Sequence, residues 1–245
     1  MNIDVIIPTF NRGHIISSAI ESVLSQTYSN YILHIVDDGS TDNTKEILSK
    51  YSGHSQIKIY YQDNRGVSSA RNLAALKSTG EWISFLDSDD IWLPKKLEIQ
   101  INYIKEHPDC NFIHSDELWI RNGKRVNPKN KHQKNHNRLL ERSLEFCIIS
   151  PSTVLMRRNL FLLHSGFDEE LIVCEDFDLW NKVLFHEKHI GFIPIPLIEK
   201  HGGHDDQLSK KFVAMDYWRI KSLFNLYHSN TIDHSNKELI KKCYN

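Results

Sequence analysis

The sequence predicts an α/β fold, a single domain with a mostly parallel central sheet flanked by helices and a helical segment near the C-terminal end. Three observations predict it. Short apolar runs alternate with helical patterns through the first half of the chain. Each apolar run ends where polar residues begin. The length of 245 residues, 40% of them apolar, suits one large domain.

The first half is typical of strands and helices in alternation. We expect strands at residues 3–8, 31–36, 57–62 and 81–86, and helices at residues 13–25, 42–50 and 66–77. The first helix has Ile16, Ile20 and Val23 on one apolar stripe. Because ligands in open α/β sheets bind outside the carboxyl ends of the strands, the residues that follow these strands should gather at one edge: Thr9, Asp37, Arg65 and Asp87.

The second half predicts a mixed sheet. We expect a helix at 94–105, a strand at 111–114, a hairpin at 118–126 turning at Asn122-Gly123, a strand at 152–156, helices from 158 and at 176–186, strands within 190–200 and a long helix at 207–227. Residues 127–137 are polar without an apolar period, which favours a linker over a lid. The apolar face of the long helix should pack on the sheet.

Composition excludes several classes of protein. The formal net charge of -1 lacks the basic footprint of a nucleic-acid binder. The four cysteines are scattered and no signal peptide precedes the first strand, which favours a reduced, cytoplasmic setting. No apolar run approaches the roughly 20 residues of a membrane span, so any membrane contact should be peripheral.

The strongest functional signal is the end of the strand at 81–86, which runs directly into Asp87, Ser88, Asp89 and Asp90. Two carboxylates near one point repel each other unless a proton or a cation neutralises them. Oxygen ligands on a sharp bend suit Mg²⁺ or Mn²⁺. The alternative is a solvated turn that caps a helix beginning near Pro94.

Four segments in order carry a resemblance to a known family. They are residues 8–12 (PTFNR), 36–42 (VDDGSTD), 66–72 (GVSSARN) and 85–90 (FLDSDD). Together they resemble the family 2 glycosyltransferases of the nucleotide-diphospho-sugar transferase superfamily. The resemblance implies a Rossmann-like glycosyltransferase A-type fold over residues 1–206, with a donor-binding half at about 1–115, an acceptor-side half at 116–206 and a helical extension at 207–245.

The resemblance also implies a donor site. A carboxylate can accept from the imide N–H of a nucleotide base or from ribose hydroxyls, so Asp37 suits the base and Asp87 the ribose. Arg71 should lie near both the nucleotide and Asp87, where it can also serve as an ion pair. The residues expected at the donor are Pro8, Thr9, Phe10, Arg12, Asp37, Asp38, Arg71, Asp87 and Ser88. A surface role is favoured for the Arg12 side chain, and strand capping is the alternative for Thr9.

A divalent cation, Mn²⁺ or Mg²⁺, is implied at the donor diphosphate. Asp89 is the expected ligand, while Asp90 is ambiguous between support of the site and helix capping, with capping favoured. In relatives a histidine after the last strand can complete such a site. His201 aligns best with that position, and His204 is the alternative.

Inverting transfer needs a base that deprotonates the acceptor hydroxyl. Glu175 and Asp176 resemble the Glu-Asp motif at the start of a family helix, and Asp176 is the expected base. The alternative is that these acids only stabilise the helix dipole. Glu175, Trp180 and Ser152 are expected on the acceptor side, although a core position is favoured for Trp180.

The resulting hypothesis is a metal-dependent inverting glycosyltransferase that moves a sugar from a UDP-linked donor to a hydroxyl of a glycan or lipid-linked saccharide. Surface polysaccharide or lipopolysaccharide assembly at the inner face of a membrane fits, and the last helix could touch the membrane or pair two subunits. Two alternatives stay open. A sugar nucleotidylyltransferase normally begins with a glycine-rich basic loop, which residues 8–13 lack. A non-catalytic module that binds a nucleotide sugar is the other.

Overall fold

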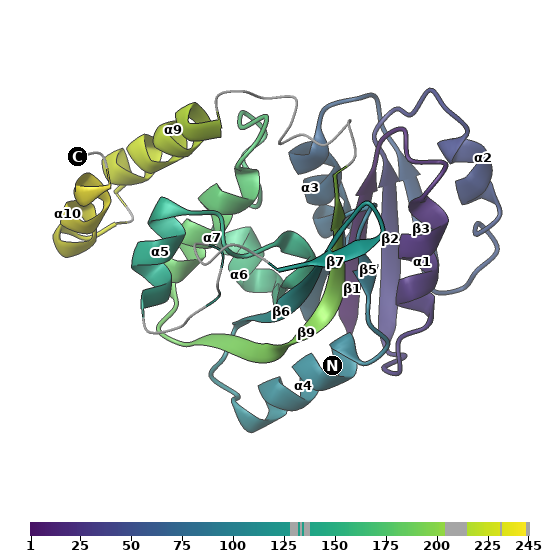
Figure 1. Cartoon of the computed structure of the whole chain (residues 1–245), viewed down its shortest axis with the longest axis horizontal. Coiled ribbons are helices and arrows are strands. Elements are labelled where there is room, and N and C mark those ends of the chain that lie inside the picture. The colour runs from purple at the N-terminus through teal and green to yellow at the C-terminus, as the bar shows by residue number, and fades with distance from the viewer. Residues whose placement is uncertain (128–131, 133, 135–137, 204–214, 231, 244–245) are drawn as a thin grey trace.

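The computed structural model describes residues 1–127, 132, 134, 138–203, 215–230 and 232–243. Its first half is the expected alternation of strands and helices (Figure 1). In chain order these elements are β1 (Ile3–Thr9), α1 (Ile16–Leu24), β2 (Tyr31–Asp37), α2 (Thr44–Ser49), β3 (Ile57–Tyr61), α3 (Val67–Lys77) and β4 (Trp82–Phe85). Helix α1 begins later than expected because Asn11 has a left-handed φ of 52° and residues 12–15 form a turn.

The four strands of this half lie in the order β3-β2-β1-β4 and are parallel. Every residue of β1 is buried, as expected for a strand with helices on both faces. The register pairs Thr9 with Asp37 across β1 and β2, and Ile6 with Phe85 across β1 and β4. The loops that follow β1, β2 and β4 therefore leave the sheet at one edge, as the sequence predicts.

The second half adds antiparallel strands and confirms the mixed sheet. Its elements are β5 (Ile91–Trp92), α4 (Lys96–Glu106), β6 (Phe112–Arg121), β7 (Lys124–Val126), α5 (Leu139–Glu145), the 3-10 turn η3 (Pro151–Thr153), β8 (Leu155–Arg157), α6 (Arg158–Leu163), α7 (Glu175–His186) and β9 (Ile190–Gly202). The strand order continues β4-β8-β6-β9-β5, and β7 pairs with β6. Strand β8 is antiparallel to both neighbours, while β6 and β9 are parallel.

Several boundaries differ from the prediction. The strand expected at 111–114 continues through the first arm of the hairpin as one strand, β6. The turn at Asn122-Gly123 is confirmed, and both residues have positive φ. The strand expected from residue 152 begins at Leu155, because Pro151 opens a 3-10 turn that occupies the preceding residues. Strand β5 and helix α5 are not predicted.

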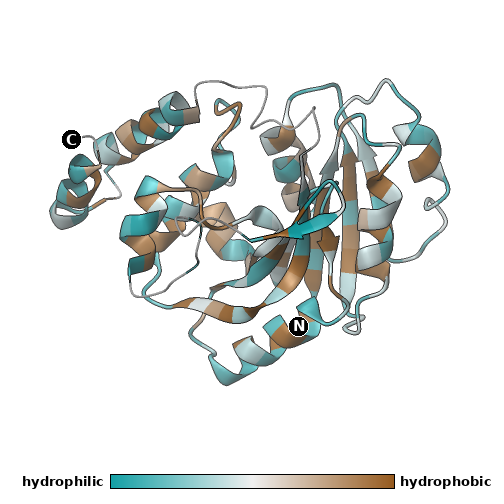
Figure 2. Ribbon diagram, viewed as in Figure 1, coloured by the Kyte–Doolittle hydropathy of each residue, from teal (hydrophilic) through white to brown (hydrophobic). Residues whose placement is uncertain are grey.

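Two apolar clusters hold the helices on opposite faces of the sheet. Ile3, Val5 and Ile7 of β1 point into a cluster that includes α1, α2 and α4, whereas Ile6 points into a cluster that includes α3, α6 and α7. This alternation follows from the two-residue period of a strand. The central strands are largely brown in Figure 2, as burial between two helical layers requires.

The C-terminal extension lies at one end of the molecule, beyond α5 and α7 (Figure 1). Its described helices are α9 (Met215–His228) and α10 (His234–Lys242). Helix α9 packs on α7 through a cluster that includes Leu223, Leu226 and Phe177. The prediction that this helix packs on the sheet is therefore wrong.

One face of α9 faces solvent. Ile220 and Phe224 lie on this face and are 52% and 55% exposed. The part of the predicted helix at 207–214 lies outside the described residues. Within the described part of the chain, no helix combines the length and the apolar composition that crossing a membrane requires.

A lysine is buried inside the fold where α4 meets the sheet. Lys96 is fully buried, and its Nζ atom donates to Ser84 Oγ (3.0 Å) and Gln100 Oε1 (2.8 Å). The ammonium also lies 3.8 Å from the centre of the Trp92 ring, within the range of a cation–π interaction. Burial lowers the pKa of Lys96 well below its ordinary value.

This burial predicts a pH dependence of stability. The folded-state pKa of Lys96 is lower than its unfolded-state pKa, so between the two values the unfolded chain binds more protons and stability rises with pH. Relative to Lys96→Met, the free energy of unfolding of the wild type should rise by up to about 1.4 kcal/mol per pH unit in that window. Urea denaturation of both proteins across alkaline pH measures the difference, and parallel profiles would contradict it.

Candidate active site

The turn after β4, residues 87–90, begins directly at the carboxyl edge of the sheet. The N–H of Leu86 donates to the Ile6 carbonyl (2.9 Å), which fixes the start of the turn on β1. The first three residues of the turn are half-buried and Asp90 is buried. The turn therefore presents carboxylates where the sequence predicts a ligand.

Arg71, on α3, joins this turn to the start of α7. Its Nη2 atom donates to Asp87 Oδ1 (2.6 Å) and its Nη1 atom donates to Glu175 Oε1 (2.7 Å). The side chain is only 3% exposed, and the guanidinium carbon lies 4.9 Å from the centre of the Phe167 ring. The ion pair with Asp87 is one that the sequence suggests, but the second partner, Glu175, is not predicted.

The charges of this cluster depend on each other. Burial opposes the charge of Arg71, but the carboxylates of Asp87 and Glu175 raise the pKa of the guanidinium. Burial raises the pKa of Glu175, while the Arg71 charge opposes that shift. The short hydrogen bonds at both ends of the guanidinium are typical of ionised partners. Arg71 therefore stays charged and holds both carboxylates.

The buried carboxylate of Asp90 holds the 87–90 turn in place through hydrogen bonds. Its Oδ2 atom accepts from Ser152 Oγ (2.6 Å) and its Oδ1 atom accepts from the His201 N–H (2.9 Å). Ser152 Oγ in turn accepts from the Asp87 N–H (3.1 Å). Burial, together with the charges of Asp89 and Asp87, raises the pKa of Asp90. The turn is therefore fastened to η3 and to the end of β9.

The first and second motifs lie side by side at the same edge. Thr9 is the register partner of Asp37, and the Asp38 N–H donates to the Thr9 carbonyl (2.9 Å). Asp37 is buried and its Oδ1 atom accepts from the Ser40 N–H (3.1 Å). Ser40 Oγ accepts from the Asn11 N–H (2.8 Å), which ties the two loops together.

Side chains of the first motif differ in their exposure. Pro8 and Thr9 are buried within β1, whereas Phe10 is 40% exposed. Arg12 is half-buried, and its backbone N–H donates to Thr44 Oγ1 (2.9 Å). Phe10 is thus the side chain of this motif with a large apolar surface open to a ligand.

Asp38 fixes the loop that leads into α3. Its buried carboxylate accepts from Gln62 Nε2 (2.6 Å), the Arg65 N–H (2.9 Å) and the Gly66 N–H (2.9 Å). Gly66 has a φ of 91°, which favours glycine, and stands immediately before the helix. Asp38 therefore positions the start of α3, the helix that carries Arg71.

Asp176 lies next to the Arg71 cluster in the first turn of α7. It is half-buried, and it follows Glu175, the residue that Arg71 binds. Its Oδ1 atom accepts from the N–H of the following residue (2.7 Å), and its Oδ2 atom accepts from Cys147 Sγ (3.1 Å). Two hydrogen-bond donors therefore hold the carboxylate of Asp176, the candidate base, which lies next in sequence to Glu175 of the Arg71 cluster.

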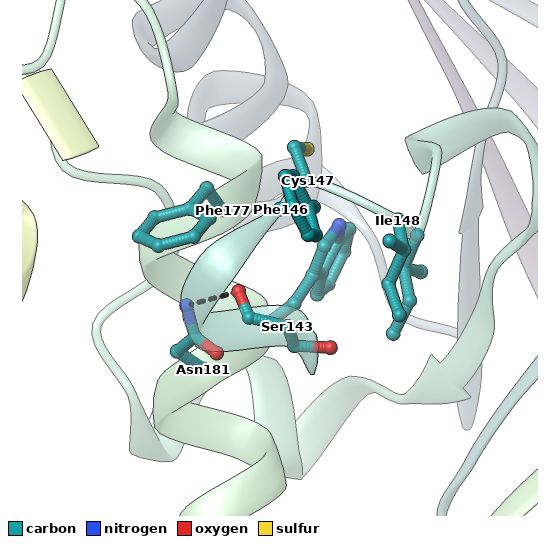
Figure 3. A pocket seen from close by; sticks show the side chains of 8 residues that line it. Ser143, Phe146, Cys147, Ile148, Phe177 and Asn181 are labelled. Carbon is teal, nitrogen blue, oxygen red and sulfur yellow. Dashed lines mark hydrogen bonds between the residues drawn. The ribbon is translucent and has the colours of Figure 1, made fainter. Parts of the chain in front are cut away.

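A small pocket lies between α5 and α7 beside this residue (Figure 3). Its lining is mostly apolar and consists of Ser143, Phe146, Cys147, Ile148, Ile149, Phe177, Trp180 and Asn181. Asn181 Nδ2 donates to the Ser143 carbonyl (3.3 Å) and joins the two helices. Because Cys147 belongs to the pocket and also bonds Asp176, the candidate base borders apolar surface on one side.

The expected metal ligands lie near the same turn. Asp89 is half-buried within it, and His201 is held through its backbone by Asp90. The His201 Nε2 atom lies 3.2 Å from Glu199 Oε2. Among the residues that the structure describes, no group of three or more His, Cys, Asp or Glu side chains could hold a metal ion. His204 and most of residues 127–137 lie outside the described residues.

Most of the chain matches one protein family. Residues 4–162 match the family model described as glycosyl transferase family 2. The chain belongs to this family. The match covers β1 to α6 and so includes all four sequence motifs, although it ends before Asp176.

Curated proteins that are similar to this chain are named as glycosyltransferases. The UDP-Glc:alpha-D-GlcNAc-diphosphoundecaprenol beta-1,3-glucosyltransferase WfgD of Escherichia coli is 36% identical over 184 residues, which cover 74% of this chain and 69% of WfgD. An uncharacterized glycosyltransferase of Rickettsia felis is 33% identical over 214 residues, which cover 85% of this chain and 32% of that protein. This chain thus spans about a third of the length of the Rickettsia relative.

Solved structures confirm the glycosyltransferase A-type fold. The first 349 residues of S. aureus TarS, in complex with UDP-GlcNAc, superpose with a TM-score of 0.82 at 22% identity and cover 100% of this chain and 72% of that one. The mannosyltransferase PcManGT of Pyrobaculum calidifontis, in complex with GDP-Man and Mn²⁺, gives a TM-score of 0.69 at 16% identity and covers 99% of this chain and 69% of that one.

Two interpretations of the sequence change with the geometry of the structure, and a third is kept. The sequence favours helix capping for Asp90, but α4 begins only at Lys96, and Asp90 holds the turn instead. Ser152 is expected on the acceptor side, but its side chain is fully buried and supports the turn. Trp180 is buried in the core, with its ring 5.3 Å from the Phe112 ring, which is the position that the sequence favours.

Lys200 interacts electrostatically with Asp90 and Asp87 of the 87–90 turn, although the family motifs do not indicate it. It is half-buried near the end of β9, opposite Trp119 of β6, and its Nζ atom donates to Ser150 Oγ (2.6 Å). Burial opposes its charge, but the carboxylates of Glu117 and Asp90 raise the pKa of Lys200. In the sequence, Lys200 is marked only by its position near the end of a predicted strand, and many lysines have such a position.

Proposed function

We propose that this chain is a metal-dependent inverting glycosyltransferase that moves a sugar from a UDP-linked donor to a hydroxyl. The observation that carries the proposal is the Arg71 bridge. One buried guanidinium binds Asp87, the candidate ribose ligand, and Glu175, which precedes the candidate base. The names of two similar proteins support the donor, since WfgD uses UDP-Glc and TarS was solved with UDP-GlcNAc.

The donor nucleotide would occupy the edge where β1, β2 and β4 end. Asp37 would accept from the imide N–H of the base, and Asp87 would accept from ribose hydroxyls. The backbone of Pro8 to Phe10 lies beside Asp37 through the register of β1 and β2. Asp38 acts indirectly in this account, because its carboxylate is occupied by the loop before α3.

Asp89 and His201 would hold Mn²⁺ or Mg²⁺. Water and substrate phosphates would supply the remaining oxygen ligands of such an ion. When bound, such a cation offsets the charge that the leaving nucleoside diphosphate gains. The Mn²⁺ complex of PcManGT supports this assignment by analogy.

The base would act from α7. Asp176 accepts the proton of the acceptor hydroxyl as that oxygen attacks the sugar carbon from the face opposite the nucleotide. The Cys147 thiol, whose ordinary pKa is about 8.5, is protonated at neutral pH and can donate to Asp176 Oδ2. That hydrogen bond holds the carboxylate in one orientation without taking its negative charge.

The acceptor would be a glycan or a lipid-linked saccharide of a surface polysaccharide. WfgD is named for a diphosphoundecaprenol-linked acceptor, and TuaG of Bacillus subtilis, 38% identical over 112 residues, is named for teichuronic acid biosynthesis. A lipid-linked acceptor would bring the chain to a membrane surface. The exposed side chains of Tyr217, Ile220 and Phe224 on α9 offer an apolar contact there.

Asp176→Asn keeps the shape of the side chain and removes the base. Turnover of UDP-sugars, measured as UDP release across a donor panel with a lipid-linked acceptor, should fall at least about 100-fold. UDP binding, measured by calorimetry, should persist, because Asp176 lies on the acceptor side. Glu170→Gln, an exposed carboxylate before α7, is the matched control and should leave turnover unchanged.

Each other outcome of this experiment has a meaning. Unchanged turnover in the Asp176 variant would reject the base assignment. Release of pyrophosphate in place of UDP would favour nucleotidylyl transfer. Binding of UDP by a wild-type protein that turns over no donor would favour a non-catalytic binding module.

Asp89→Ala tests the metal assignment separately. Mn²⁺ should strengthen UDP binding to the wild type, and the variant should lose most of that gain, with a loss of about 10- to 100-fold in apparent metal affinity. Its binding of UDP without metal should be unchanged. Asp63→Ala, at an exposed aspartate, is the control. A variant that keeps the full Mn²⁺-dependent affinity for UDP would reject Asp89 as a ligand.

A further inference from the structure

Arg71 and Lys200 are two cationic side chains near the 87–90 turn, and they differ in their hydrogen-bond partners. Both terminal nitrogens of Arg71 are bonded to carboxylates, so its charge is balanced within the fold. Lys200 donates to a neutral hydroxyl, Ser150 Oγ, and forms no ion pair with the described residues. An ammonium group has three N–H donors, so the hydroxyl leaves it with capacity for an anionic ligand.

The carboxylates near Lys200 have partners of their own. Glu117 forms an ion pair with Lys134 (3.0 Å), and Asp87 forms one with Arg71. Asp90 accepts hydrogen bonds through both of its oxygens. These groups keep Lys200 charged without binding it directly.

Lys200 is connected through the next residue in the chain to the 87–90 turn, which would hold the donor. The next residue, His201, donates its backbone N–H to Asp90, so β9 is fixed against the turn at this point. Asp90 is joined through Ser152 to the backbone of Asp87, the candidate ribose ligand. The residue after Lys200 is therefore connected to the Asp87 backbone by a chain of three hydrogen bonds.

Lys200 is also connected to the segment that contacts the candidate base. Its hydrogen-bond acceptor, Ser150, is the residue before η3 and belongs to the segment that begins with Cys147. Cys147 donates to Asp176. Lys200 is thus linked through neighbouring residues to the turn that would hold the donor, and through Ser150 to the segment whose Cys147 donates to Asp176.

We propose that Lys200 binds a phosphate oxygen of the donor diphosphate, an assignment that rests on the proposed function. During transfer the bond between the sugar carbon and the diphosphate oxygen breaks, and its electron pair stays on the diphosphate. The bond to the acceptor oxygen forms as the hydroxyl proton passes to Asp176. A fixed cation beside the leaving group stabilises the charge that develops there.

The test compares ligands with and without the diphosphate. Lys200→Met keeps the length of the side chain and removes the charge. Its affinity for UDP should fall about 10- to 100-fold, as expected for the loss of a hydrogen bond to a charged group, while its affinity for uridine is unchanged. Lys200→Arg should recover part of the UDP affinity. Lys58→Met, at an exposed lysine on β3, is the control. The same comparison is run with GDP and guanosine.

The outcomes separate this inference from the proposed function. A wild-type protein that binds neither diphosphate contradicts the proposed function itself. Wild-type binding of UDP that Lys200→Met retains in full overturns the assignment of Lys200 alone. Equal losses for UDP and uridine indicate a structural role and also overturn it. A variant with normal UDP affinity but a raised KM for the acceptor shows that the lysine serves the acceptor, which contradicts the proposal.

Discussion

The site depends on one buried interaction, the Arg71 guanidinium held between the carboxylates of Asp87 and Glu175. A buried guanidinium without such partners would be strongly destabilising, so the two carboxylates offset the cost of its desolvation. Helix α3 supplies the arginine, the strand edge after β4 supplies one carboxylate and the start of α7 supplies the other. Three elements far apart in sequence thus meet at one charge. The donor turn and the candidate base are positioned together as a result.

The acidic residues of the motifs divide into those whose carboxylates hold loops and those that are proposed to contact ligands. Asp38 and Asp90 are both buried, and their oxygens accept hydrogen bonds from the backbone and from neighbouring side chains. Asp89 is half-buried in the turn and borders the donor edge. Neighbouring carboxylates of one sequence motif therefore have different roles. Asp38 and Asp90 set the shape of the loops, whereas Asp37, Asp87 and Asp89 are the proposed ligand contacts.

The parallel half of the fold could be predicted because its signals are local: apolar runs that end at polar residues, separated by helical patterns. The edge position of Asp87 and its ion pair with Arg71 follow from the same logic. The second half could not be predicted in detail, since β6 and β9 pair across distant segments and β5 is too short for a period. The tasks of Ser152 and Lys200 depend on hydrogen bonds to residues 50 or more positions away, which no local pattern encodes.

The most direct test of this account is a double-mutant cycle on Asp87→Asn and Glu175→Gln, with the free energy of unfolding measured by urea denaturation. Each single variant leaves Arg71 with one charged partner, whereas the double variant leaves it with none. The double variant should therefore lose more stability than the sum of the singles, with a coupling of about 0.5–3 kcal/mol. Strictly additive losses would contradict the claim that one arginine binds both sides of the site.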